Sequence, residues 1–482
     1  MKDLKKINVI TFSIAILFMI LFSYSIANVT TKIAAVVTIL PLVFVILLIF
    51  SKKYYLVLNI MVVTAFLIPL LIRYIGGVPY GLLIDFFLLY IGVSLIFNKK
   101  ISIEKNMLNN PLIIISFLWF LVSLISFFNP LSTNKIAWLY ANRAFSIYSL
   151  MIIFLVLQFF RDQKMLDKFL TVWGIMAVFG TLWGIKQLFF GVSATEQQWL
   201  DAGARSTHVL WGRLRVFSFF TDASQFAAHQ AHTAVVFGIL GISQKKMSKK
   251  ILYILFSLIT LYGLIISGSR GPLAIVFVGI LVYIIMLNRV AINFWSLLIL
   301  SGAFVFLKFT FIGQSVYQIN RMRTALNPEN NPSFQIRMDR IEQLTDFMSN
   351  NPLGFGVGSA GTWAQRFYQS GPEILKYTDG LYISVWMQTG ILGLSIKIIL
   401  ILILAVYLGI LIARMKNQSH KNIGIALYAP FCGLVVADFA NNLSTQLPSG
   451  VIVPITLAII FLLAEGKITE HPAPLKNQKT LK

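Results

Sequence analysis

The sequence is short of charge, of acidic residues and of cysteine. Of its 482 residues, 12% are charged and only 17 are acidic, against 40 basic ones, while 57% are apolar. This balance is not that of a soluble globular protein. The lone cysteine, Cys432, lies inside an apolar run, which excludes an internal disulfide framework and a metal cluster built on cysteines.

The apolar residues are collected in runs long enough to cross about 30 Å of hydrocarbon at about 1.5 Å per residue. The chain is therefore predicted to be an all-α polytopic membrane protein. A net charge of +23 would suit nucleic-acid binding, but the basic residues stand at the ends of apolar runs and not along one soluble face. Membrane topology explains most of them, so the lipid bilayer is an expected partner and nucleic acid is not.

Hydropathy predicts about 14 transmembrane helices, in a range of about 12–14. The first follows a basic start that lacks a small-residue cleavage site, and we expect it to be retained. The predicted spans are residues 8–27, 33–50, 54–72, 81–97, 111–128, 143–160, 169–190, 224–243, 251–266, 272–287, 291–311, 391–412, 423–439 and 451–463.

The distribution of Lys and Arg predicts which loops face the cytoplasm. With a cytoplasmic N-terminus, the cytoplasmic segments carry the larger share of these residues, although the outer side has the longest loops. Both termini are then cytoplasmic. The expected segments are 1–190, 224–311 and 391–465 (transmembrane helices), 191–223 (first long outer loop), 312–390 (large outer loop) and 466–482 (cytoplasmic tail).

The two outer segments are too long to be simple connectors, and loops of this length are usually functional. The first is polar. The second is predicted to be partly helical, because residues 332–350 have helical spacing, and a glycine-rich turn at residues 351–358 ends that helix. The turn lacks the strand and the Gly-Lys-Ser/Thr ending of a nucleotide-binding loop, so no nucleotide is expected there.

The first pattern that can carry chemistry is residues 213–222, which lead directly into an apolar run. An arginine at headgroup level can grip two phosphate oxygens with its planar guanidinium while it stays partly hydrated. Arg215 is the main candidate, and Arg213 and Asp222 are candidates for substrate binding beside it. The alternative is an interfacial anchor that snorkels to the headgroups.

The second pattern is residues 267–271 (Ser-Gly-Ser-Arg-Gly), a charged break between two long apolar runs. An arginine this close to lipid is costly, so an anion is its expected partner, and a phosphate-bearing lipid is the obvious one. Gly268 and Gly271 would let the backbone turn tightly and aim Arg270 into a cavity, where it would converge with Arg215 on one pyrophosphate. The alternative is that Arg270 only binds the last carbonyls of the preceding helix.

The third pattern is residues 378–393, where Asp379 opens an amphipathic helix that is expected to end at Gly390. Asp379 would act as a helix cap, as a general base that takes a proton from an attacking hydroxyl, or as both. No metal site is expected.

Arg337 and Arg340 are candidates for further contacts with phosphate or acidic sugars. The preferred alternative pairs them with Glu342 and Asp346 on a solvated helix. Some aromatic residues near the site, Tyr382 first among them, could stack on sugars, although packing or anchoring is expected for most. These aromatic residues are Trp211, Trp363, Tyr368, Tyr377, Tyr382 and Trp386.

The order of these patterns resembles that of the O-antigen ligase and Wzy-type polymerase superfamily. The resemblance covers residues 191–393 by motif and the whole chain by span pattern. It implies an integral-membrane glycosyltransferase on the outer face of the cytoplasmic membrane, which uses an undecaprenyl-diphosphate-linked glycan and needs no cofactor. By this resemblance Arg215 and Arg270 bind the diphosphate, residues 312–390 form a catalytic loop, and a chain-length regulator is a conceivable further partner.

The sequence departs from the ligase pattern at one position. In ligases the third motif starts with histidine and asparagine, followed by nine residues, Gly, two residues and Gly. Counting back from Gly390 places Asp379 and Gly380 there, and the histidine is absent. We therefore favour a polymerase of lipid-linked repeat units over a ligase that attaches finished glycan to another acceptor.

A flippase or transporter of lipid-linked glycans is the alternative from another class. Charged residues inside the predicted spans would then line a translocation path. Most of them lie near span ends, and paired discontinuous helices are not found in corresponding halves of the sequence. The charged residues considered for such a path are Asp85, Lys186, Lys308, Lys397 and Asp438.

Overall fold

The computed structural model describes residues 54–77, 79–97, 109–210, 212–287, 290–313, 315, 320, 323, 332–376, 378 and 380–469. These residues are mostly helical, and the sheet among them is a two-stranded hairpin. The predicted spans 8–27 and 33–50 lie outside the described residues, as does most of the tail. Every other predicted span coincides with a helix.

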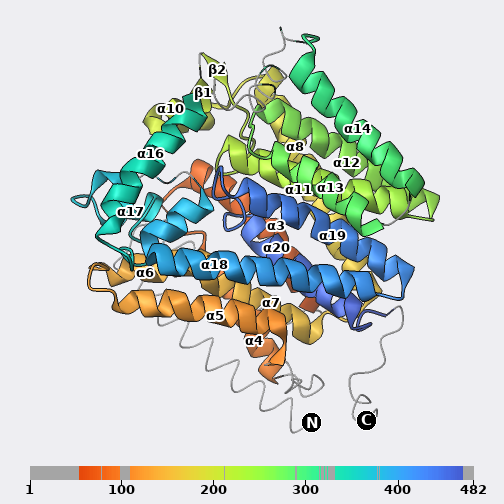
Figure 1. Cartoon of the computed structure of the whole chain (residues 1–482), viewed down its shortest axis with the longest axis horizontal. Coiled ribbons are helices and arrows are strands. Elements are labelled where there is room, and N and C mark those ends of the chain that lie inside the picture. Colours follow the sequence, from red (N-terminus) through yellow and green to blue (C-terminus); the bar gives the residue numbers. More distant parts are fainter. Residues whose placement is uncertain are drawn as a thin grey trace, which may run out of the picture. The chain divides into compact units, whose positions relative to one another are not determined.

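The chain divides into two compact units, residues 1–99 and 100–482. In the first unit α3 (Tyr54–Ile75) packs against α4 (Leu82–Phe97). The helices of the second unit (Figure 1) are α5 (Pro111–Ile125), η2 (Ser126–Phe128), α6 (Lys135–Asn142), η3 (Arg143–Ile147), α7 (Tyr148–Phe159), α8 (Gln163–Phe189), α9 (Ala194–Trp199), η4 (Leu200–Ala204), α10 (Arg205–His208), α11 (Ala223–Ser243), α12 (Met247–Ser267), α13 (Leu273–Leu287), α14 (Val290–Phe309), α16 (Pro332–Ser349), α17 (Thr362–Phe367), η6 (Glu373–Lys376), α18 (Leu381–Arg414), α19 (Gln418–Ala437) and α20 (Ser449–Ala464). Its strands are β1 (Val209–Leu210) and β2 (Arg213–Leu214), which pair antiparallel.

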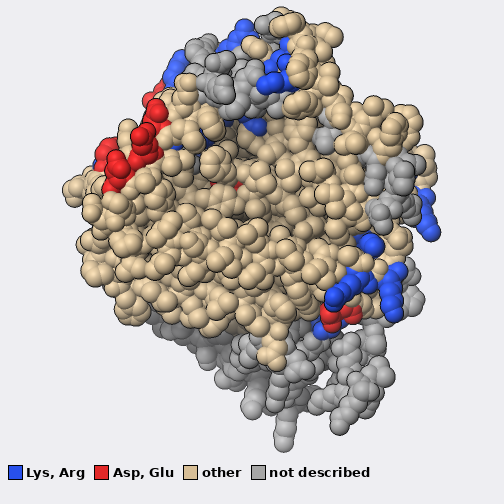
Figure 2. All heavy atoms as spheres, viewed as in Figure 1, with Lys and Arg blue, Asp and Glu red and all other residues tan. Residues whose placement is uncertain are grey.

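Among the described residues, seven helices are long and apolar enough to cross a membrane, and four further apolar helices are shorter. Large apolar side chains are exposed on many of them, as expected for surfaces that face lipid. Figure 2 shows acidic side chains gathered over α16 and a wide, largely uncharged surface over α5 and α18. The predicted class, an all-α membrane protein, is confirmed.

The core of the second unit is α11, which is buried along almost its whole length and packs against α8, α12, α13 and α19. Small residues allow this close approach, as is usual between membrane helices. A Cβ added to Gly174 of α8 would overlap the ring of Phe256 in α12. One added to Gly263 would lie 2.6 Å from Thr181 Oγ1 and 3.1 Å from Cγ of Gln230 in α11.

Two contacts join loop segments that are far apart in the sequence. Lys249, before the bulk of α12, forms an ion pair of 2.6 Å with Asp167, in the first turns of α8. Thr469 bridges to Asp162 at the start of α8. These contacts join segments predicted to lie on one side, whereas the candidate site described below joins segments predicted to lie on the other.

The two outer segments have secondary structure of their own. The first outer loop, for which no element was predicted from the sequence, folds into α9, η4, α10 and the β1–β2 hairpin. The helix that was expected to end at Gly390 does end there, because Gly390 has non-helical backbone angles, with a φ of 68° and a ψ of −173° that other residues would adopt only with strain. A second helical stretch follows at once, so α18 consists of two helical halves that meet in a kink at Gly390.

Candidate functional site

Arg215 connects the first outer loop to the Ser-Gly-Ser-Arg-Gly motif. Its Nη1 donates to the carbonyl oxygen of Thr207 at 3.1 Å. Its Nη2 donates to Ser224 Oγ at 3.2 Å and to Ser269 Oγ at 3.0 Å. Ser269 Oγ in turn donates to the carbonyl oxygen of Ala223 at 3.1 Å. The guanidinium therefore lies where the start of α11 meets the residue that directly precedes Arg270.

Within the motif, Gly268 ends α12. Gly268 has a φ of 60°, and its N–H donates to the carbonyl oxygen of Ile265 at 3.2 Å. This left-handed cap satisfies one of the last carbonyl groups of α12. The half-buried Arg270 begins the turn into α13, since its carbonyl oxygen accepts from the N–H of Leu273 at 3.1 Å.

Asp379 lies outside the described residues, but its neighbour Gly380 is placed. The N–H of Leu381, at the start of α18, donates to the carbonyl oxygen of Asp438 at 2.9 Å. A Cβ added to Gly380, whose φ is 114°, would overlap the carbonyl oxygen of Phe439. The start of α18 therefore rests directly on the turn that ends α19.

The loop between α19 and α20, residues 438–448, also contacts the other two motifs. A Cβ on Gly271 would lie 2.9 Å from that of Ala440. Thr221 Oγ1 donates to Gln446 Oε1 at 2.8 Å, and Gln225 Nε2 donates to the carbonyl oxygen of Gln446 at 3.3 Å. Segments far apart in the sequence therefore meet on this one loop.

A buried carboxylate fixes the shape of the α19–α20 loop. Asp438 Oδ1 accepts from the N–H groups of Leu443 at 2.8 Å and Ser444 at 3.0 Å, and the residue is only 2% exposed. Sequence reasoning gave this loop no role and considered Asp438 only for a transport path. The sequence feature that could have identified this loop is a run of uncharged polar residues between two apolar spans: Asn441, Asn442, Ser444, Thr445 and Gln446.

The glycine-rich turn at residues 351–358 braces the kink in α18. The N–H groups of Phe355 and Gly356 donate to the carbonyl oxygens of Met387 at 2.9 Å and Gln388 at 2.8 Å. Gly358 N–H donates to Gln388 Oε1 at 2.7 Å. The turn therefore replaces hydrogen bonds that the helix loses at its kink, and it positions the half of α18 that begins next to Asp379.

Among the other candidates, Asp222 and Tyr382 have structural partners. Asp222 caps α11, because its Oδ1 accepts from the N–H groups of Ser224 at 2.7 Å and Gln225 at 2.9 Å. The hydroxyl of Tyr382 donates to the carbonyl oxygen of Val435 in α19 at 2.7 Å. These bonds favour structural roles over direct substrate contact for both residues.

The remaining arginine candidates lie in the two outer segments. Arg213 is exposed on the β1–β2 hairpin. On α16, Arg337 is half-buried and Arg340 is exposed. Arg340 lines a cavity of about 280 Å³ together with Glu373 of η6 and apolar side chains of α16 and α18.

Two of the aromatic candidates pack inside the outer segment. Trp363 stacks on Tyr140 with ring centroids 5.6 Å apart, and Trp386 packs against the apolar cluster around Leu344 and Met387. Trp211 and Tyr377 lie outside the described residues.

A second cavity, of about 130 Å³, lies among membrane helices below the α19–α20 loop. Lys397 and Asp438 both line it, among mainly apolar side chains. Lys397 Nζ lies 4.3 Å from the ring centroid of Trp119. The cavity is smaller than the range of about 300–1,000 Å³ that is usual for pockets of drug-sized ligands, so it does not offer a passage for an oligosaccharide.

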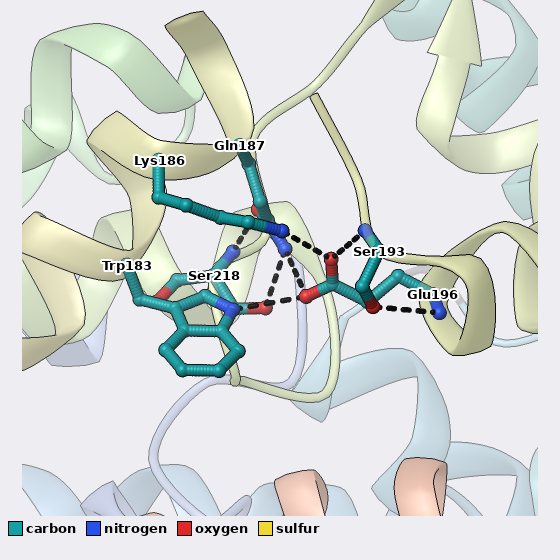
Figure 3. Close-up of polar contacts among 6 residues, drawn as sticks. All are labelled: Trp183, Lys186, Gln187, Ser193, Glu196 and Ser218. Atoms are coloured by element: carbon teal, nitrogen blue, oxygen red, sulfur yellow. Dashed lines mark hydrogen bonds and ion pairs between the residues drawn. The ribbon is translucent and has the colours of Figure 1, made fainter. Parts of the chain in front are cut away.

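Sequence reasoning also missed a buried glutamate in the first outer loop, Glu196 (Figure 3). Its Oε1 accepts from Trp183 Nε1 at 2.9 Å and Gln187 Nε2 at 2.8 Å. Its Oε2 accepts from the N–H of Ser193 at 2.7 Å and forms an ion pair of 3.4 Å with Lys186. Burial alone would raise the pKa of this carboxyl, but the hydrogen bonds and the lysine outweigh burial, and the pKa is lowered.

The described histidines do not occupy the position of the ligase histidine. His208 lies in the first outer loop, where its ring is buried against Trp199 and Phe217. His229 and His232 lie in the core of α11, and His420 lies in the first turn of α19. The departure from the ligase pattern is therefore not compensated by one of these four side chains at the start of α18.

The family comparison gives one match. Residues 255–398 match the family model described as O-antigen ligase. The match runs from α12 through the Ser-Gly-Ser-Arg-Gly motif and the large outer loop into α18, and it ends before the α19–α20 loop. Among curated proteins, none matches the chain. The resemblance of this multi-pass membrane protein to the O-antigen ligase and Wzy-type polymerase superfamily is therefore confirmed over residues 255–398.

Proposed function

We propose that the protein polymerises undecaprenyl-diphosphate-linked oligosaccharide repeat units on the outer face of the cytoplasmic membrane, in the biosynthesis of a surface polysaccharide. One observation carries the proposal. The three motifs meet on the α19–α20 loop, through Thr221, Gly271 and Gly380. The hydrogen bond from Arg215 Nη2 to Ser269 Oγ adds a direct link between the first two motifs.

This arrangement suits the departure of a lipid diphosphate. An acceptor hydroxyl attacks the anomeric carbon, and the bond from that carbon to the diphosphate oxygen breaks, with inversion of configuration. Negative charge develops on the leaving diphosphate, where the guanidinium groups of Arg215 and Arg270 stabilise it without donating a proton. The hydroxyl proton passes to the carboxylate of Asp379 as general base. Holding the two glycans in line adds an entropic advantage.

A ligase is the second candidate, because the matched family model is that of O-antigen ligase. The two reactions share the donor and the leaving group and differ in the acceptor. The absence of the ligase histidine favours the polymerase. A flippase is disfavoured, because the cavity beside Lys397 and Asp438 is too small for a glycan.

The test is an assay of the purified protein with an undecaprenyl-diphosphate repeat unit as sole substrate. A ladder of longer lipid-linked glycans is expected, and Arg270→Ala or Asp379→Asn should abolish it. Asp346→Asn, on the exposed face of α16, is the control that should leave the ladder intact.

Each alternative has its own outcome. Transfer only after another acceptor is supplied would make the protein a ligase, and no transfer to any acceptor would support the flippase. Loss of the ladder in Asp438→Asn but not in Asp379→Asn would move the base from the start of α18 to the α19–α20 loop.

A further inference from the structure

The buried Glu196 is connected to the Arg215 segment through Gln187 of α8. Gln187 Nε2 donates both to Glu196 Oε1 at 2.8 Å and to the carbonyl oxygen of Ser218 at 3.0 Å. Gln187 Oε1 accepts from the N–H of Ser218 at 2.7 Å. Figure 3 shows the two side chains and the backbone of Ser218 joined in this one network. One amide group therefore holds both backbone groups of a single loop residue.

The charge on Glu196 decides which way that amide points. An ionised carboxylate can only accept hydrogen bonds, so the Nε2 end of Gln187 must face it. If the amide were flipped, its oxygen would face the carboxylate and its NH₂ group would face the N–H of Ser218. Because all these groups are buried, both mismatches would be costly. Glu196 therefore orients Gln187, and Gln187 holds Ser218.

The backbone conformation of Ser218 needs hydrogen bonds of this kind to stabilise it. Its φ of 54° is in the left-handed region, where residues other than glycine are strained. Its Oγ also donates to the carbonyl oxygen of Gly180 in α8 at 2.7 Å. Ser218 follows Arg215 by three residues, and the residues between them are fully buried. At the other end of this short stretch, the N–H of Arg215 donates to the carbonyl oxygen of His208 at 2.8 Å.

We propose that Glu196 is a positioning residue for lipid-diphosphate binding: through Gln187 and Ser218 it fixes the backbone that aims the Arg215 guanidinium at Ser269 and at the leaving diphosphate. The inference rests on the function proposed above. Glu196 does not contact substrate in this account. Its carboxylate is bound to α8 by Trp183 and Lys186. Through this carboxylate, α8 supports the loop that carries Arg215.

Kinetics of two single variants and their combination test the proposal. Glu196→Gln places an NH₂ group where the carboxylate accepted hydrogen bonds from its donors. Gln187→Glu places a second carboxylate beside Glu196 and removes the group that donates to the carbonyl oxygen of Ser218. Each is expected to lower kcat about 10-fold to 100-fold, as a misplaced catalytic group does, with a smaller change in KM. The double variant Glu196→Gln/Gln187→Glu restores a donor facing an acceptor and should recover part of the loss.

The matched control is Asp201→Asn, which removes an exposed ion pair with Arg205 from the same loop. It should leave the rate unchanged, since exposed pairs contribute little. Single variants within about twofold of wild type, or a double variant no faster than its slower parent, would overturn the proposal.

Cross-linking reports the position of the loop without any transfer reaction. With Cys432→Ala as background, Arg215→Cys and Ser269→Cys are joined by a bifunctional thiol reagent with a flexible spacer. Adding Glu196→Gln should slow cross-linking, while reaction with a monofunctional reagent stays the same. An unchanged cross-linking rate would overturn the positioning role. If the wild-type protein transfers nothing but Glu196→Gln slows cross-linking in the cysteine variants, only the proposed function is overturned.

Discussion

Ser218 is the residue at which backbone strain and a buried hydrogen bond oppose each other. Its hydroxyl donates to Gly180, while its positive φ costs about 1–2 kcal/mol for a residue with a Cβ. Ser218→Ala keeps the strain and loses the bond, so it should destabilise the protein by about 1 kcal/mol. Ser218→Gly also loses the bond but relieves the strain, and it should be the more stable of the two. Thermal unfolding in one detergent compares them; an alanine variant as stable as the glycine variant would contradict the strain.

The lowered pKa of Glu196 predicts how the stability of the protein depends on pH. The pKa of this carboxyl is lowered in the folded protein relative to the ordinary value of 4.5. The ionised form therefore contributes stability that is fully present above about pH 4.5 and is lost as the pH falls through the folded-state pKa. Glu196→Gln should lower the stability by about 1–3 kcal/mol at neutral pH. The difference in Tm between the two proteins should shrink as the pH is lowered toward 3, and a gap that stays constant would refute the assignment.

At the scale of elements, the kink of α18 depends on two glycines that touch. A Cβ added to Gly390 would overlap the carbonyl oxygen of Pro352, and one on Gly354 would lie 2.5 Å from the nitrogen of Gly390. Gly390→Ala should therefore destabilise the protein by about 3 kcal/mol or more and abolish transfer. Gly302→Ala in α14 is the control, because nothing lies within 4 Å of its added Cβ, and it should be neutral or stabilising. Equal behaviour of the two variants in expression and Tm would contradict this packing.

The sequence predicted most helices, because each needs only an apolar run of sufficient length. It also predicted the break at Gly390, since a glycine with positive φ normally ends a helix, but it did not predict that the turn at residues 351–358 braces this break, because those hydrogen bonds are long-range. The folding of the first outer loop was missed for the same reason. Its anchor is Glu196, whose partners in α8 cannot be recognised from local spacing.

For the candidate site, the sequence predicted the motifs but not the place where they meet. The three motifs were recognised individually, and the structure joins Arg215 to the neighbour of Arg270. Their meeting point, the α19–α20 loop, has no charged residue after Asp438 and no motif, so its role follows only from the tertiary contacts of Gly271 and Gly380. The assignment of Asp379 as base stays a prediction.

At the scale of the whole molecule, the proposed chemistry does not call for a metal. The chain has 40 basic and 17 acidic residues, and the part of it that the structure describes contains no group of three His, Cys, Asp or Glu side chains placed to hold a metal ion. Guanidinium groups would supply the charge that Mg²⁺ or Mn²⁺ supplies to many transferases. EDTA should therefore leave the rate of glycan elongation within about twofold of its initial value. A metal-dependent transferase treated in parallel shows that chelation is complete. Loss of elongation in EDTA, with recovery on adding a divalent cation, would require a metal in the catalytic step. Arg215 and Arg270 would then not be the only groups whose positive charge stabilises the leaving diphosphate.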